Sequence, residues 1–171
     1  MGSEGRGRSR SPRQRGSKGR GVLAEEELEG VLQNAGLDLV AWRSTRAVDL
    51  SGVDLHVVSF ADERGEYKLN LQVKFSEVKS GQVRFSAPYP GFASYRDRGV
   101  HGLVFMADDK FFVVPFGFGN VKFPELNLEV CNLKRKLTDF KRIFESKGLL
   151  FDRNSFPHQV KGMIAALQTK S

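Results

Sequence analysis

Hydrophobic and polar residues alternate most regularly between Gly52 and Ser76. Apolar side chains recur over residues 53–58 and again over residues 69–75, and the polar stretch 61–65 separates the two runs. Alternation with a period of two predicts β-strands, because successive side chains of a strand point to opposite faces. The charged and glycine-containing stretch between them predicts a hairpin. We therefore expect two antiparallel strands here.

The rest of the pattern predicts an α/β domain. Apolar residues recur at helical spacing in three segments, each near a glycine or proline that helps to delimit it: residues 22–35, 134–147 and 157–168. Further strands are expected at residues 37–42, 82–87, 100–106 and 111–116. These elements predict one domain with a mixed sheet of about five strands flanked by helices.

The predicted hairpin carries polar side chains suited to chemistry. In the returning strand Gln72 and Lys74 alternate with apolar residues, and Asp54 lies where the first strand begins. The Asp54 carboxylate and the Gln72 carbonyl are oxygen ligands of the kind that Mg²⁺ prefers. Lys74 could orient a water molecule or neutralise charge that builds on a phosphate. The pattern indicates a magnesium-dependent phosphodiesterase site. Asp49, which also lies between valine and leucine, is the alternative to Asp54 as the acidic ligand.

Asp54 and the triplet Gln72-Val73-Lys74 resemble the signature of the PD-(D/E)XK nucleases, in the Q-x-K form that some members carry. The order of the following segments is similar to that of the intron-encoded homing endonuclease branch, over roughly residues 21 to 118. The resemblance implies a restriction-endonuclease-like fold and a Mg²⁺-dependent DNA endonuclease with Asp54, Gln72 and Lys74 as catalytic residues. The alternatives are a nuclease like the Holliday-junction resolvases and a non-catalytic nucleic-acid-binding module.

Members of this family also carry a metal-binding glutamate on the first helix. The acidic run on the predicted helix comprises Glu25, Glu26, Glu27 and Glu29. Glu25 flanks the apolar stripe one turn before Leu28, so it could reach Asp54. We therefore expect Glu25 to complete the metal ligands Asp54 and Gln72, and the other acids to face solvent.

Charge is distributed unevenly along the 171 residues, whose formal net charge is +7. Residues 1–21 hold seven cations against one acid, so the domain from residue 22 to 171 keeps a surplus of only one. This stretch, rich in glycine, serine and arginine, predicts a disordered basic arm suited to DNA phosphates. A localisation signal or a solubilising extension would have the same composition.

Two further segments contain residue types that suit contact with DNA. The loop 88–99 contains Tyr95, Arg96 and Arg98, a combination that suits a nucleic-acid contact, although Phe92 and Tyr95 could instead anchor the loop to the core. The helix predicted at residues 134–147 would present a basic outer face that could follow a phosphate backbone, although a solvated helix face is the commoner explanation of such a pattern.

The chain has a single cysteine, Cys131, and no apolar run of membrane-spanning length. We expect a soluble, intracellular protein, cytoplasmic or associated with the nucleoid, with no membrane partner. DNA is the expected partner, and a cut through both strands would require a homo-oligomer, because one site cuts one strand.

Overall fold

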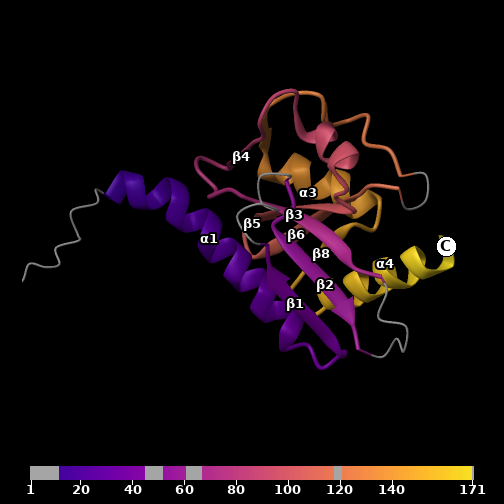
Figure 1. The fold of residues 1–171 in the computed structure, drawn as a ribbon. Coiled ribbons are helices and arrows are strands. Elements are labelled where there is room, and N and C mark those ends of the chain that lie inside the picture. The colour runs from indigo at the N-terminus through magenta and orange to yellow at the C-terminus, as the bar shows by residue number, and fades with distance from the viewer. Residues whose placement is uncertain (1–11, 45–51, 61–66, 118–120, 171) are drawn as a thin grey trace, which may run out of the picture.

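The computed structural model describes residues 12–44, 52–60, 67–117 and 121–170 (Figure 1). The helices are α1 (Pro12–Gln33), α3 (Leu137–Ser146), α4 (Phe156–Lys170) and the 3₁₀ helix η2 (Phe92–Arg98). The strands are β1 (Leu39–Arg43), β2 (Leu55–Ser59), β3 (Leu69–Phe75), β4 (Gln82–Ser86), β5 (Gly102–Ala107), β6 (Lys110–Pro115), β7 (Asn132–Lys136) and β8 (Leu150–Phe151).

Within this part of the chain, the main sheet has six strands in the order β1-β2-β3-β5-β6-β8. β3 and β5 are parallel, whereas the other neighbouring pairs are antiparallel. The predicted α/β class, the mixed sheet and the hairpins β2–β3 and β5–β6 are therefore confirmed. The tip of the first hairpin, residues 61–66, lies outside the described residues. β4 and β7 form a separate antiparallel sheet of two strands.

Both faces of the central strands are covered. α1 and α4 contribute Leu28 and Val160 to a core on one face, where they join Leu71 and Val73 of β3. The other face packs against α3, β4 and β7 in a core whose largest members are aromatic: Phe85, Phe92, Phe105, Phe112, Phe140 and Phe144. This double coverage explains the nearly continuous hydrophobic sequence of β5 and β6.

α1 begins at Pro12, ten residues before the predicted start at Val22. The prediction began where the apolar periodicity begins, but proline is favoured at the first position of a helix and arginine, lysine and glutamine are good helix formers. The predicted boundary of the basic arm at residue 21 therefore falls inside α1. Residues 1–11 are outside the described part of the chain.

The helix predicted at residues 134–147 begins only at Leu137, so its first three residues were assigned wrongly. Asn132–Lys136 is instead β7, which pairs with β4 along its whole length. A strand with a single buried apolar residue, Leu133, has too little alternation to be recognised before its partner is known. The basic outer face predicted for this helix is accordingly divided between β7 and α3.

The last helix, predicted at residues 157–168, is confirmed as α4. Immediately before it, the Asp152 carboxylate accepts hydrogen bonds from the N–H groups of Ser155 and Asn154, each 2.9 Å long. The bonds from Ser155 in particular lower the pKa of Asp152 below its usual value.

No helix within the described residues is both long and apolar enough to cross a membrane.

Candidate active site

The candidate site forms where β2 and β3 separate. Leu55, the first residue of β2, pairs with Leu71 of β3, and the pairing of the two strands ends there. The N–H of Asp54 still donates to the Leu71 carbonyl at 2.8 Å, and the next β3 donor, Val73 N–H, bonds the Asp54 carboxylate oxygen Oδ2 at 2.8 Å. The carboxylate thus takes the place of a backbone carbonyl. With 6% of its surface exposed, Asp54 is held firmly at this point.

Gln72 and Lys74 leave β3 on the face opposite Leu71 and Val73, as the alternation predicts. Gln72 on that face is buried, with only 6% of its surface exposed. The Gln72 amide nitrogen donates to the Val73 carbonyl at 3.3 Å. The carbonyl oxygen of the same amide is therefore the atom that could face a cation.

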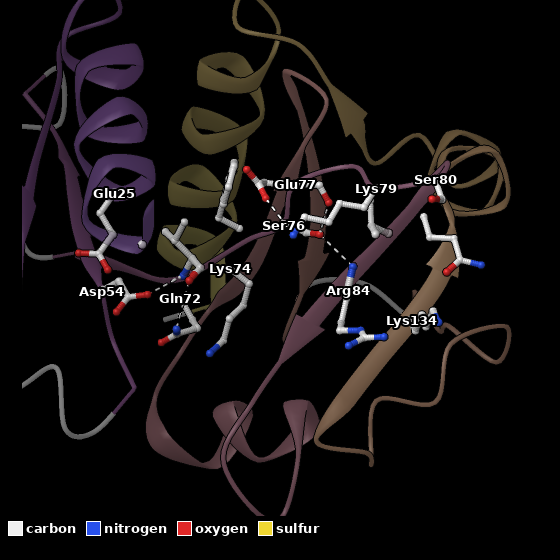
Figure 2. A pocket seen from close by; sticks show the side chains of 15 residues that line it. Glu25, Asp54, Gln72, Lys74, Ser76, Glu77, Lys79, Ser80, Arg84 and Lys134 are labelled. Atoms are coloured by element: carbon white, nitrogen blue, oxygen red, sulfur yellow. Dashed lines mark hydrogen bonds and ion pairs between the residues drawn. The ribbon is translucent and has the colours of Figure 1, made fainter. Parts of the chain in front are cut away.

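One pocket of about 720 Å³ gathers Glu25 of α1, Asp54 before β2, and Gln72 and Lys74 of β3 (Figure 2). The figure shows the Glu25 carboxylate reaching from α1 towards Asp54, with the ends of Gln72 and Lys74 on the same side of the pocket. Lys79, Arg84 and Lys134 line its other end. Glu77 also lines the pocket and lies 3.5 Å from Lys79. Two carboxylates therefore lie at one end of the pocket, and the other end keeps a surplus of cations.

The remaining acids of α1 are engaged elsewhere. Glu26 and Glu29 each lie 3.7 Å from the Arg43 guanidinium, and Glu27 forms an ion pair with Arg153. These pairs tie α1 to β1 and to the segment before α4, so the expectation that the three acids simply face solvent was incomplete. Glu25 is the acid of this run that lines the pocket.

The donor set at the carboxylate end fits a hard cation. The carboxylates of Glu25 and Asp54 and the amide carbonyl of Gln72 supply oxygen atoms, the ligands that Mg²⁺ binds in proteins. Mg²⁺ typically keeps several waters beside one or two carboxylates. The described residues contain no group of three or more histidine, cysteine, aspartate or glutamate side chains that could hold a metal ion. Any metal here would accordingly depend on two carboxylates and the Gln72 amide. The rival acid Asp49 lies outside the described residues.

Tyr95 is not available for stacking on a base, contrary to the prediction, because only 2% of it is exposed. Together with fully buried Phe92 it anchors the loop to the core, which was the alternative interpretation. Its ring supports two cations: Lys74 Nζ lies 5.4 Å and the Arg98 guanidinium 5.8 Å from the ring centroid. Arg96 is exposed beside the ring of Phe116.

Sequence reasoning missed a chain of hydrogen bonds next to the site. Ser44 Oγ and His56 Nε2 are 2.9 Å apart, His56 Nδ1 and Asn70 Oδ1 are 2.9 Å apart, and Asn70 Nδ2 donates to the Gly99 carbonyl at 3.1 Å. Because Asn70 Oδ1 can only accept, His56 Nδ1 donates in this bond. The alternation of Asn70 with Gln72 was the one available signal.

The network braces the strands around Asp54. Ser44 also donates its backbone N–H to the Asp54 carbonyl at 2.9 Å, so β1, β2 and β3 are joined immediately beside the candidate ligand. His56 is 5% exposed. Its two ring nitrogens connect Ser44 and Asn70, so in this structure His56 links the strands.

The chain matches no protein-family model, and no curated protein is significantly similar to it in sequence. The resemblance to the PD-(D/E)XK nucleases therefore stands on the motif alone, and function must be argued from the pocket.

Proposed function

We propose that this protein is a Mg²⁺-dependent endonuclease that hydrolyses DNA phosphodiester bonds at the pocket of Figure 2. One observation carries the proposal: Glu25, Asp54, Gln72 and Lys74 come from three separate segments of the chain and line the same pocket. A chance polar face on a hairpin would not draw in a helix acid as well. The combination of two carboxylates, an amide and an ammonium group is the one that the Q-x-K motif requires.

Each side chain has a distinct task in this proposal. Asp54, oriented by the Val73 N–H, and Glu25 supply negative charge for a cation, and Gln72 adds a neutral oxygen. A bound Mg²⁺ would polarise the phosphate and lower the pKa of a water ligand. Lys74, lying over the Tyr95 ring, offsets negative charge on the phosphate oxygens.

A homing-type endonuclease and a junction-resolving nuclease use the same chemistry on different DNA, so the pocket favours neither. A non-catalytic DNA-binding module is the rival of another class. Two carboxylates at the end of a pocket repel phosphate, which favours a role with a metal over binding alone. We further propose that two copies of the chain act together where both strands are cut, and that one copy nicks a single strand.

The test is cleavage of supercoiled plasmid and of four-way branched DNA, with Mg²⁺ and with EDTA, by Lys74→Ala and Asp54→Asn. We expect both substitutions to lower the cleavage rate at least ~10²-fold, the scale seen when one charge-stabilising group is lost. Asparagine keeps an oxygen that can accept from Val73 N–H, so Asp54→Asn should still fold.

Lys141→Ala is the matched control, because Lys141 of α3 forms a 2.7 Å ion pair with Asp108 and does not line this pocket. It should cleave at the unsubstituted rate, and thermal unfolding should show all three variants folded. Full activity of both pocket variants at saturating Mg²⁺ would overturn the proposal. Preference for branched over plasmid DNA would assign the enzyme to the resolving type.

A further inference from the structure

The β4–β7 ribbon forms the wall of the pocket opposite the carboxylates. Arg84 of β4 is directly opposite Lys134 of β7 in the register, and both line the pocket. Val83, Phe85 and Leu133 face the aromatic core and are each 1% exposed. The opposite face of the ribbon is exposed and carries only polar and basic side chains: Arg84, Ser86, Asn132, Lys134 and Lys136.

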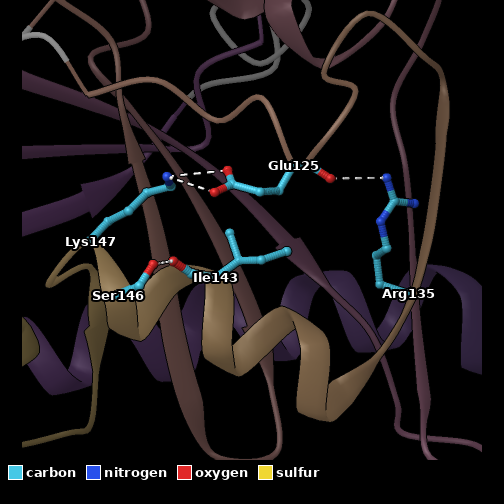
Figure 3. Close-up of polar contacts among 5 residues, drawn as sticks. All are labelled: Glu125, Arg135, Ile143, Ser146 and Lys147. Carbon is cyan, nitrogen blue, oxygen red and sulfur yellow. Dashed lines mark hydrogen bonds and ion pairs between the residues drawn. The ribbon is translucent and has the colours of Figure 1, made fainter.

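Two like charges face each other across this ribbon, an arrangement that costs stability in an antiparallel pair. Among the described residues, no ion pair joins Arg84 or Lys134 to an acid. Neighbouring cations are treated differently. Arg135 donates to the carbonyl of Lys134. It also donates to the Glu125 carbonyl, and Lys147 lies 3.2 Å from the Glu125 carboxylate (Figure 3). Arg84 and Lys134 thus offer their charge to an external anion.

The ribbon is fixed relative to the candidate site. Ser76, two residues after Lys74, accepts the Arg84 N–H on its Oγ at 2.9 Å and donates its own N–H to Met106 of β5 at 3.0 Å. The backbones of Lys79 and Gln82 exchange hydrogen bonds of 3.0 and 2.9 Å, which closes a tight turn at the start of β4. A ligand held by the ribbon is therefore held at a set place relative to Lys74.

We infer that the exposed face of the β4–β7 ribbon binds backbone phosphates of duplex DNA adjacent to the phosphate at the carboxylate end. This inference rests on the proposed function, since it takes the substrate of that same pocket to be DNA. Charge complementarity carries it: two adjacent cations that form no ion pair within the described residues line the same pocket as the candidate metal ligands. Phosphate contacts fix register on the duplex without reading its sequence.

The double variant Arg84→Gln/Lys134→Gln tests the inference through binding rather than cleavage. Fluorescence anisotropy would follow a labelled duplex in EDTA over a series of salt concentrations. Each lost phosphate contact reduces the slope of log K against log salt by about 0.9, so we expect a slope shallower by about 1.8. Arg84→Lys, which keeps the charge, should retain the slope.

Lys141→Gln/Arg142→Gln is the control, since it removes the same charge from α3, where Lys141 pairs with Asp108 and Arg142 with Asp139. Its slope should stay that of the unsubstituted protein. An unchanged slope in the ribbon variant, an equal loss in the control, or a loss confined to one DNA sequence would overturn the inference. If the unsubstituted protein bound DNA through the ribbon but cut no DNA in Mg²⁺, the nuclease proposal would fail while the ribbon assignment stood.

Discussion

At the scale of single residues, Asp54 and Gln72 combine a structural role with the candidate chemical one. Asp54 completes the hydrogen-bond ladder of β3, and Gln72 bonds the carbonyl of its neighbour, so both are held in place without a ligand. Each is 6% exposed. A buried polar group destabilises the fold unless it has a hydrogen-bond partner. We therefore expect a single substitution that adds charge here to change the stability of the protein.

Gln72→Glu tests that sensitivity. A third carboxylate beside Asp54 and Glu25 should lower the free energy of unfolding in EDTA by on the order of 2 kcal/mol, because buried like charges raise one another's pKa. Mg²⁺ should reverse the loss and should support cleavage at a lower concentration, since the added charge favours the cation. Urea denaturation with EDTA and with Mg²⁺, together with a Mg²⁺ titration of the cleavage rate, measures both effects.

Gln82→Glu is the matched control, because Gln82 lines the cationic end of the same pocket, opposite Lys136 of β7. There the new carboxylate should cause no loss in EDTA. Equal stability of the two variants, with identical Mg²⁺ midpoints, would show that Gln72 does not face a metal.

At the scale of elements, η2 supports the site from behind, because it carries the Tyr95 ring against which Lys74 lies. The segment enters this helix through Gly91, whose φ of 135° is hard for other residues to adopt. A Cβ at this position would lie 2.6 Å from the Glu129 carbonyl oxygen. The nearest atoms belong to the backbone of Glu129 and Val130, so no flexible side chain could move aside to relieve the contact.

We therefore expect Gly91→Ala to destabilise the protein by about 3 kcal/mol, through strain and displacement of η2. Gly162→Ala in α4 should act in the opposite direction, adding about 0.5–1 kcal/mol, because a Cβ there meets open space in a helix. Urea denaturation of both variants measures whether the free energy of unfolding falls in the first and rises in the second. A Gly91→Ala protein as stable as the original would refute the close packing of η2.

At the scale of the whole molecule, basic residues are concentrated in residues 1–21 and on the ribbon. Of the seven cations in residues 1–21, three precede α1 and the other four belong to its first half. A deletion at residue 21 would therefore remove part of a helix. Deleting residues 1–11 instead removes three arginines and leaves α1 at its full length.

Deleting residues 1–11 should make the salt dependence of DNA binding shallower by up to ~2.7, because three arginines could each neutralise a phosphate at about 0.9 per contact. Anisotropy over a salt series measures this change. The cleavage rate at saturating DNA should be unaffected, since these residues offer no metal ligand beyond Glu4. Lost cleavage with intact binding would instead make the segment part of the active site.

The placement of several candidate site residues could be predicted from local pattern. Alternation placed Gln72 and Lys74 on one face of a strand, and helical periodicity placed Glu25 beside the apolar stripe of α1. Both inferences depend on backbone geometry that each segment carries by itself. The α/β class and the hairpins followed from the same periodicities.

Pairing between distant segments was decided only by the tertiary structure. Asn132–Lys136 becomes a strand because β4 supplies its hydrogen bonds, and Tyr95 is buried because the core closes around its loop. Arg84 and Lys134 are separated by some fifty residues, and a period of two or 3.6 says nothing about which strands meet. The sequence by itself determined which side chains share a face. Only the fold decided that the carboxylates and the basic ribbon enclose one pocket, because long-range contacts are set by how the faces bury one another.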